Sequence, residues 1–244
     1  APPTTSAYQM GVNGLSSNAH TQGANTATAL RSLWINVDFA PVADVPASTA
    51  SFMYQEHRTF SSSATTTARL ADAFASGLET GHVEPTMKHF PGIGYATRNT
   101  DIYVVTIGAS KTALAPGLKP YITAIGHHLP LVMLSNATYT AYDPYNAAGW
   151  SHAIAVTLLR TTLGFTGVSI TDSLSGTAHA RGVSVHSLAL KAAKAGTDMI
   201  LVTDSEASTS ALFDRLVSDA NAGSISHTTL LTSYHRILAL KATL

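Results

Sequence analysis

The sequence predicts an α/β fold in which a parallel sheet is covered by helices. Short apolar segments rich in β-branched residues alternate with amphipathic segments along the chain, and the links between them are short. This alternation is typical of βαβ units. Two of the apolar segments end in polar groups, Lys88-His89 in one and Asp172 in the other. Because parallel sheets carry their chemistry at the carboxyl ends of strands, the pattern favours an enzyme.

Five segments have the length and composition expected of strands. They cover residues 34–45, 83–90, 130–136, 167–171 and 197–202. The first is an apolar run that passes into a loop, and the fourth runs directly into Asp172. A closed (β/α)8 barrel needs about eight strands. The expected strands therefore do not close a barrel.

Seven segments have the pattern of helices. They cover residues 24–33, 61–81, 118–126, 151–163, 185–195, 206–222 and 227–242, with loops expected over residues 1–12 and 91–112. The second helix opens with Ser and Thr and then places Leu70, Phe74 and Leu78 at helical spacing. Gly164 and Gly196 directly follow two of the others, as helix-ending glycines do.

The composition limits the possible partners. Hydrophobic residues make up 45% of the 244 residues, and charged residues only 11%, well below the usual quarter. Fourteen basic and fourteen acidic side chains cancel, and no basic stripe appears, so we expect neither nucleic acid nor an anionic membrane surface as a partner. No apolar run approaches the ~18 residues of a spanning helix. The absence of cysteine excludes disulfides and thiolate metal sites.

The organisation of the chain is simple. No repeat, linker or low-complexity tract interrupts residues 1–244, so we expect a single domain. Low charge, no cysteine and abundant Ser, Thr and Ala suit a secreted or cell-envelope protein, with a cytoplasmic location as the alternative. The first residues, Ala1-Pro2-Pro3, include no Met, which is compatible with a removed signal peptide or with a chain that simply starts there.

Asp172 is the first candidate for chemistry. It follows a strand, and no Lys or Arg lies within several residues on either side. A carboxylate in this position can be the N-cap of the next helix or a nucleophile or general base. Asp101, in the loop after the Lys88 strand, could be its partner. Retaining glycosidases hold two carboxyl groups about 5–5.5 Å apart, and inverting ones about 6.5–9.5 Å.

The cationic candidates are Lys88, His89 and Arg58. Neighbours on a strand point to opposite faces, so Lys88 and His89 share a site only if the strand twists or ends there. The alternative is a surface lysine and a buried, hydrogen-bonded histidine. Arg58 by itself fits an ion pair that braces a loop, and Asp44 fits a loop-bracing carboxylate better than a ligand.

Other catalytic patterns are absent. Gly92-Ile93-Gly94 has the first two glycines of a dinucleotide fingerprint but no third glycine, and no acidic residue follows at the required distance. There is no Gly-x-Ser-x-Gly elbow, no P-loop and no His-Glu-x-x-His. The eleven histidines are scattered. We therefore expect no cofactor and no metal.

Taken together, four segments resemble motifs of glycoside hydrolase family 3, in particular of its single-domain bacterial β-N-acetylglucosaminidases. These segments are residues 35–45, Lys88-His89-Phe90-Pro91-Gly92, residues 164–172 and residues 195–202. They occur in the family's order and span nearly the whole chain. The resemblance implies a (β/α)8 TIM-barrel-like domain over residues 1–244.

The resemblance also implies an activity. A member of this family would be a retaining exo-β-glycosidase that hydrolyses terminal β-linked N-acetylglucosamine by double displacement, with a β-glucosidase as the alternative. Asp172 matches the family nucleophile. Arg58, Lys88 and His89 match residues that hold the hydroxyls of the sugar, and Asp44 matches a position that we interpret as structural. No cofactor is implied.

Three departures from the family pattern matter. The acetylglucosaminidases carry an Asp-x-His dyad after the Lys-His strand, and the aligned positions here hold Asn99 and Asp101. Asp101 is then the tentative acid/base, provided that its pKa is raised. The family strand that ends in Asp-Gln-Glu-Gly-Gly should precede Pro2, so the chain resembles a barrel without its first βα units. A later domain that supplies the acid/base in two-domain relatives is also not present in this sequence.

The departures leave further possibilities open. A catalytically impaired, sugar-binding relative is the second hypothesis, and a glycoside phosphorylase is a third, although such phosphorylases also use a histidine. An open barrel leaves two sheet edges unpaired, and such edges are normally paired or covered. We therefore expect either a rearranged closure or a homodimer that covers the gap.

Overall fold

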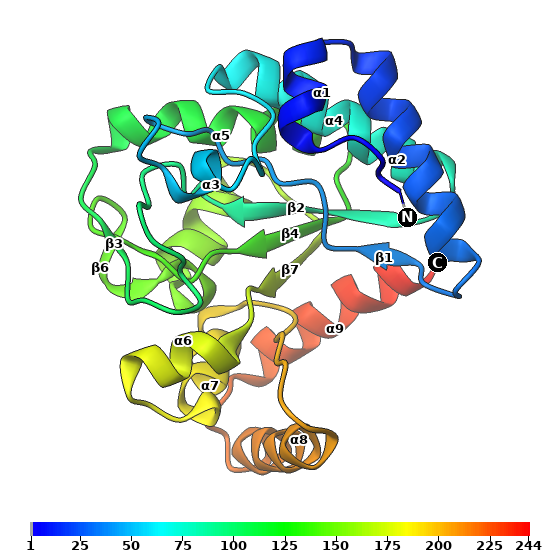
Figure 1. The fold of residues 1–244 in the computed structure, drawn as a ribbon. Coiled ribbons are helices and arrows are strands. Elements are labelled where there is room, and N and C mark those ends of the chain that lie inside the picture. Colours follow the sequence, from blue (N-terminus) through cyan, green and yellow to red (C-terminus); the bar gives the residue numbers. More distant parts are fainter. Residues whose placement is uncertain (1) are drawn as a thin grey trace.

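The computed structural model describes residues 2–244, and its centre is a four-stranded parallel sheet (Figure 1). The strands follow one another in the sheet in the order in which they occur in the chain. They are β1 (Val37–Asp38), β2 (Glu84–Phe90), β4 (Leu131–Leu134) and β7 (Val168–Thr171). Single bridges extend the ladder beyond these strands, from Val42 to Lys88 and from Ile170 to Met199. Four of the five expected strand segments thus contain strands of one parallel sheet, although β1 covers only two residues of its segment. The strand expected over residues 197–202 is wrong, because that segment contributes only the single bridge at Met199.

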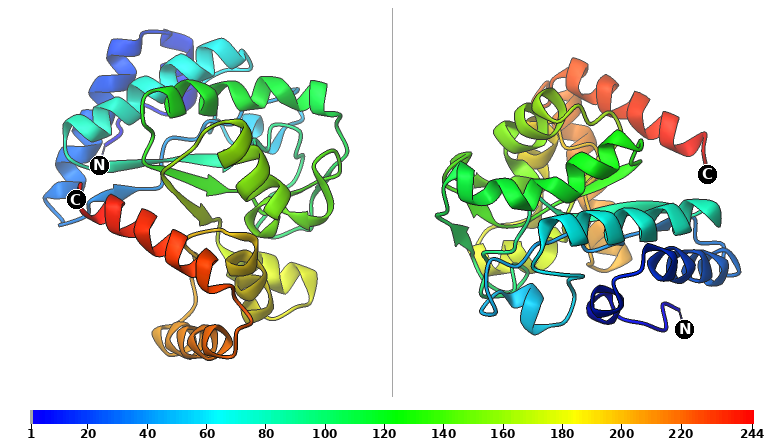
Figure 2. Two further views of the ribbon diagram at one scale, coloured as in Figure 1. Left: turned by 180° about the vertical axis from the view of Figure 1, so that it is seen from behind. Right: turned by 90° about the horizontal axis from the view of Figure 1, so that it is seen from above.

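Helices connect the strands and cover the sheet. They are α1 (Ala7–Asn13), α2 (Ser16–Arg31), α3 (Phe52–Gln55), α4 (Ala64–Thr80), α5 (Lys111–Gly126), η1 (Ala148–Trp150), η2 (Ala153–Thr162), α6 (Leu174–Arg181), α7 (Val185–Ala195), α8 (Glu206–Asn221) and α9 (His227–Lys241). Figures 1 and 2 show α2, α4 and α5 side by side over one face of the sheet. None of the helices in the described part of the chain combines the length and apolar character needed to cross a bilayer.

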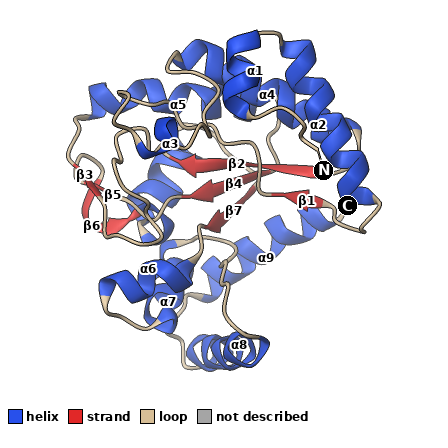
Figure 3. Cartoon of the chain, in the orientation of Figure 1, coloured by secondary structure: helices blue, strands red, loops and turns tan. Residues whose placement is uncertain are grey.

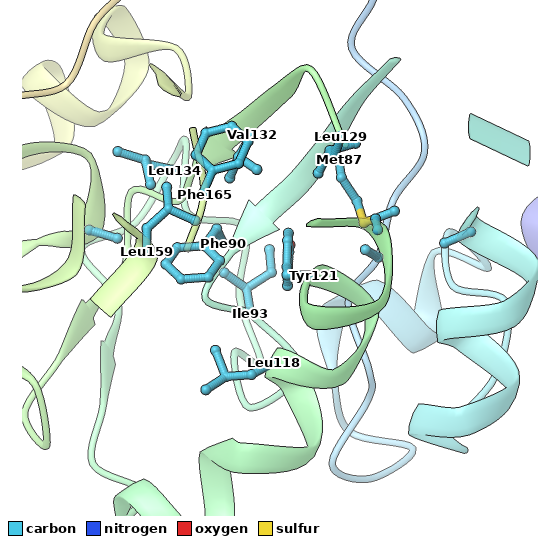
Figure 4. Packing of buried hydrophobic residues seen from close by; sticks show 14 of the residues in the cluster. Met87, Phe90, Ile93, Leu118, Tyr121, Leu129, Val132, Leu134, Leu159 and Phe165 are labelled. Carbon is cyan, nitrogen blue, oxygen red and sulfur yellow. The ribbon is translucent and has the colours of Figure 1, made fainter. Parts of the chain in front are cut away.

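The main hydrophobic core lies between the sheet and this helical layer. Figure 4 shows Phe90 of β2 beside Tyr121 of α5, with Leu134 of β4 and Leu118 of α5 in the same cluster. The rings of Phe90 and Tyr121 meet edge to face, with centroids 5.0 Å apart. Because Met87 and Phe90 of β2 both enter this core, the carboxyl end of the strand is held in a fixed position against the helical layer.

A small second sheet lies beyond the carboxyl ends of β2 and β4 (Figure 3). It consists of β3 (Thr106–Ile107), β5 (Thr138–Tyr139) and β6 (Asp143–Ala147). The strands are too short to be recognised from hydrophobic periodicity. Their role is to shape the loops that follow β2 and β4. A second apolar cluster, around Trp150, Leu174 and Leu188, lies among η1, α6 and α7. The expectation that the chain forms a single domain stays a prediction.

The structure corrects several expected helix bounds. The segment predicted as helix from residue 24 is already helical from Ser16, and α1 lies in a region expected to be loop. Helix α5 begins at Lys111 rather than at 118, with Ser110 as its N-cap, although Pro116 and Pro120 lie inside it. Helix α6 was not expected at all. By contrast, α7 has the predicted bounds, and Gly196 ends it in the left-handed conformation at φ 89°.

Candidate active site

The predicted polar residues meet where the strands of the parallel sheet end. Lys88 and His89 lie in the last part of β2, and Asp172 directly follows β7. Asp44 lies in the segment that continues from β1, and a backbone hydrogen bond from Ala43 to the carbonyl of Lys88 fixes this segment against β2. The folding of β1, β2 and β7 into one sheet, with β4 between the last two, thus brings together residues that are far apart in the sequence.

Asp172 and His89 face each other. The distance from His89 Nε2 to Asp172 Oδ2 is 4.0 Å, and both side chains are largely buried, with 7% and 13% exposure. The backbone N–H of Asp172 donates to the carbonyl of Leu134, and Asp172 Oδ1 accepts from the N–H of Ser173 at 2.8 Å. The N-cap position of α6 belongs to Ser173, so the interpretation of Asp172 as a helix cap is wrong.

Asp44 holds the other side of the His89 ring. Its Oδ2 lies 2.7 Å from His89 Nδ1, and its Oδ1 accepts from the N–H of Ile93 at 2.7 Å and from that of His89 at 3.4 Å. Asp44 is completely buried. The expected bracing role is therefore present, and it includes the imidazole that faces Asp172. The sequence alternative of a buried, hydrogen-bonded histidine also fits His89. Its other ring nitrogen, Nε2, is directed at Asp172.

Lys88 and Arg58 supply positive charge beside the carboxylates. The pKa of Lys88 is lowered mainly by burial and then by the charge of Arg58, while Asp172 is the strongest of the carboxylates that oppose this effect. Lys88 and His89 can share the site because the ladder between β2 and β4 shifts register between Lys88 and Phe90. The regular alternation of faces ends there. Within residues 2–244, no ion pair of 4.0 Å or less involves Arg58. This observation does not support the alternative in which Arg58 braces a loop through an ion pair.

Asp101 lies in the loop after β2, on the same side of the sheet. Its pKa is raised by burial and then by the negative charge of Asp172, and it is lowered less by His89, by a hydrogen bond from Asn136 and by Arg58. A raised carboxyl pKa is what a general acid requires. The loop is packed tightly, since a Cβ at Gly176 of α6 would come within 2.5 Å of the carbonyl oxygen of Asp101.

Asn136 is a residue of this region whose role was missed. Its Nδ2 donates to Asp101 Oδ1 at 3.4 Å and to the carbonyl of Ser173 at 2.9 Å. The side chain therefore links the Asp101 loop to the segment that carries Asp172. Asn136 also begins an Asn-Ala-Thr glycosylation sequon, but its side chain is only 1% exposed and therefore not accessible in the folded protein. Its position two residues after the end of β4, at the carboxyl edge of the sheet, is the signal that could have identified it.

The described residues contain no group of three or more His, Asp or Glu side chains arranged to hold a metal ion. The charged groups that surround Asp172 are instead two cations, an imidazole and a second carboxyl. This combination can bind several hydroxyl groups of a polyol, attack an electrophilic carbon and transfer a proton.

Comparison with known proteins identifies the family. The model of the "Glycosyl hydrolase family 3 N terminal domain" matches residues 3–240. The chain belongs to glycoside hydrolase family 3. The family expected from the sequence motifs is thus confirmed.

Relatives and solved structures agree with this assignment. "Beta-hexosaminidase LpqI" of Mycobacterium tuberculosis is 32% identical over 219 residues, which cover 87% of this chain and 55% of that protein. An "Uncharacterized secreted glycosyl hydrolase" of Arthroderma benhamiae is 32% identical over 247 residues, covering 99% of this chain and 70% of that protein. The chain thus spans from about half to about two thirds of the length of these curated relatives.

Two solved structures have the same fold. A glycoside hydrolase family 3 β-N-acetylglucosaminidase from Paenibacillus sp. aligns with a TM-score of 0.93 and 30% identity, over 99% of this chain and 46% of that one. A β-N-acetylhexosaminidase from Beutenbergia cavernae aligns with a TM-score of 0.90 and 31% identity, over 97% of this chain and 71% of that one. The expected TIM-barrel-like fold class is confirmed by these alignments.

Proposed function

We propose that this member of glycoside hydrolase family 3 is a retaining exo-β-glycosidase that removes terminal β-linked N-acetylglucosamine. The observation that carries the proposal is the placement of Asp172 opposite the imidazole of His89, at 4.0 Å, in a group that also contains Lys88 and Arg58. The choice of sugar is supported by the relatives named β-hexosaminidase and β-N-acetylglucosaminidase. Hydrolysis needs only water as a second substrate.

The first chemical step would be attack by a carboxylate oxygen of Asp172 on the anomeric carbon. A C–O bond to Asp172 forms as the glycosidic C–O bond breaks, through an oxocarbenium-like transition state. Asp101 would donate its proton to the departing oxygen, and the raised pKa of Asp101 supports this role because it keeps the carboxyl protonated to higher pH. The products of this step are the free aglycone and a covalent glycosyl-enzyme.

The second step would reverse these roles. Asp101, now a carboxylate, takes a proton from water while the water oxygen attacks the anomeric carbon and the bond to Asp172 breaks. Two inversions give net retention. Lys88, His89 and Arg58 would hold the sugar hydroxyls during both steps. The N–H groups of Lys88 and Arg58 can donate to hydroxyl oxygens, and the imidazole of His89 can hydrogen-bond a hydroxyl group.

A panel of nitrophenyl β-glycosides tests the proposal. We expect release of nitrophenol from the N-acetylglucosaminide and no detectable turnover by an Asp172→Ala variant. Preference for the glucoside would indicate the β-glucosidase alternative instead. Absence of turnover with every sugar, combined with measurable sugar binding, would indicate the impaired, sugar-binding relative.

The proposed location is outside the cytoplasm or in the cell envelope. The support is the A. benhamiae relative, which is named a secreted glycosyl hydrolase and matches 99% of this chain. Fractionation of the cells that produce the protein would test this assignment, and recovery only in the cytosolic fraction would contradict it.

A further inference from the structure

The hydrogen bonds of Asp44 determine which nitrogen of His89 carries a proton. Asp44 is completely buried, and each of its oxygens lies against N–H donors. Oδ1 accepts from the backbone N–H of Ile93 at 2.7 Å, while Oδ2 lies 2.7 Å from His89 Nδ1. A carboxylate oxygen only accepts hydrogen bonds, so the proton in the second contact must be on Nδ1.

The opposite edge of the ring faces the proposed nucleophile. His89 Nε2 is 4.0 Å from Asp172 Oδ2, beyond the range of a direct hydrogen bond. The charged groups around the ring are Asp44 from the segment after β1, Asp172 after β7 and Asp101 from the loop after β2, with Lys88 adjacent in the chain. Nε2 is thus the nitrogen that remains for a ligand.

We propose that Asp44 is a positioning residue, which acts through His89. By holding the proton on Nδ1 it directs Nε2 at the sugar, and in the neutral ring Nε2 then accepts a hydrogen bond from a sugar hydroxyl. This inference rests on the proposed glycosidase function. It assigns a role to a carboxylate that touches neither the sugar nor the reacting atoms.

The tautomer matters because of the short distance to Asp172. If the neutral ring carried its proton on Nε2 instead, an N–H donor would point towards Asp172 Oδ2. A modest movement would bring the two within hydrogen-bond distance, and the bond would engage the oxygen lone pair that must attack the anomeric carbon. The contact with Asp44 therefore keeps the nucleophile free while the ring still binds the substrate.

The variant Asp44→Asn separates this role from simple bracing. The amide has nearly the same shape, and its Oδ1 can still accept from the N–H of Ile93. Its NH2 group, however, would face His89 Nδ1, which must then become an acceptor, so the ring proton moves to Nε2. We expect kcat to fall roughly 10²- to 10⁴-fold, as when an orienting carboxylate is replaced by its amide in other histidine-dependent sites.

The first readout is the tautomer itself. NMR of protein labelled with ¹⁵N-histidine, with His89→Gln used to assign the signals, should show His89 protonated on Nδ1 in the wild type and on Nε2 in Asp44→Asn. Asp143→Asn is the matched control, because Asp143, at the start of β6, also accepts backbone and hydroxyl hydrogen bonds but is not among the residues of this site. It should leave the His89 signals and kcat unchanged.

The second readout is a double-mutant cycle. Asp44→Asn should lower kcat strongly in the wild-type background and by less than about twofold in the His89→Gln background, since there is then no imidazole to orient. Equal losses in both backgrounds would overturn the proposal. An NMR spectrum that shows no proton on Nδ1 of His89 in the wild type would also overturn the proposal. This measurement does not depend on any variant being folded. Should the wild type hydrolyse no glycoside, the proposed function fails, while the NMR comparison still decides whether Asp44 sets the tautomer.

Discussion

At the scale of single residues, the structure explains why two acidic side chains of one site can differ in character. Partial burial, and then the nearby charge of Asp172, raise the pKa of Asp101. Asp172 faces His89 and lies near Lys88. Environments that push carboxyl groups towards different protonation states are how glycosidases obtain an acid and a nucleophile from the same functional group.

The role of Asp101 predicts a specific pH profile. As a general acid, Asp101 works only while protonated, so activity should fall as the pH rises through its raised pKa. Asp101→Asn should remove this alkaline limb and lower kcat/KM for a disaccharide roughly 10²- to 10⁴-fold. A dinitrophenyl glycoside should be affected much less, because its leaving group needs no proton. An unchanged profile in the variant would exclude Asp101 as the acid.

The candidate residues could be predicted from the sequence in part. Asp172, Lys88 and His89 follow from the rule that chemistry gathers at strand carboxyl ends, and the structure does place them together. The function of Asp44 could not be predicted, since nothing in its local sequence indicates that it hydrogen-bonds an imidazole 45 positions away in the chain. The contact depends on the pairing of β1 with β2.

At the scale of elements, strands and amphipathic helices were predictable because their apolar residues recur with the residue spacing of a strand or of a helix. The first half of α2 was not, since residues 16–24 are mostly Ser, Ala, Asn, Thr, Gln and Gly and form no apolar stripe. Small residues serve another purpose there. They allow the backbones of α2 and α4 to approach closely, at Gly23 and Gly77.

This close approach predicts the effect of a single methyl group. A Cβ at Gly77 would lie 2.1 Å from the carbonyl oxygen of His20, so α2 and α4 would have to separate. Gly77→Ala should lower the free energy of unfolding by roughly 1–3 kcal/mol, as overpacking does. Gly126→Ala is the matched control, because that position in α5 has no atom within 4 Å of the added Cβ. Urea denaturation of both variants measures the difference, and equal stabilities would contradict the packing argument.

Helix α4 also carries a carboxyl group that links stability to pH. Partial burial, and then the charges of Glu84 and Asp72, raise the pKa of Glu79 to about 7, with His127 opposing them. Because the pKa is raised in the folded state, protonation of Glu79 stabilises the fold. This contribution is complete below the unfolded pKa of about 4.5 and is lost as the pH rises through about 7.

Glu79→Gln should therefore flatten the dependence of Tm on pH between about 5 and 8. The Glu79 side chain is only partly buried, so solvent screening limits the effect to less than about 1 kcal/mol. Thermal unfolding of wild type and variant at both ends of this range measures it. A variant that keeps the wild-type slope would show that Glu79 is not the group responsible.

At the scale of the whole molecule, the sheet has two edges that are unpaired within residues 2–244. Strand β1 pairs only with β2, and on the other side Met199 contributes a single bridge. Large apolar side chains are exposed near these edges, with Trp34 before β1 at 91% and Tyr234 of α9, the helix that packs on β7, at 56%. Unpaired edges with apolar surroundings favour association.

We therefore predict that the 244-residue chain forms a homodimer in solution, which covers the open edges. Light scattering coupled to size-exclusion chromatography should give twice the mass of one chain, and Trp34→Glu should shift the mass towards that of the monomer. Ile122→Glu is a suitable control, since Ile122 is 52% exposed but lies on α5, in the helical layer. A monomer at all concentrations would refute the prediction.

The most direct test of the account as a whole is covalent trapping of the nucleophile. The protein is incubated with a 2-fluoro β-glycoside that carries a good leaving group, and the digested product is analysed by mass spectrometry. We predict one added fluoroglycosyl group, located on the peptide that contains Asp172, and no addition in the Asp172→Ala variant. Labelling of a different carboxyl group, or hydrolysis of the reagent with inversion at the anomeric carbon, would contradict the proposed mechanism.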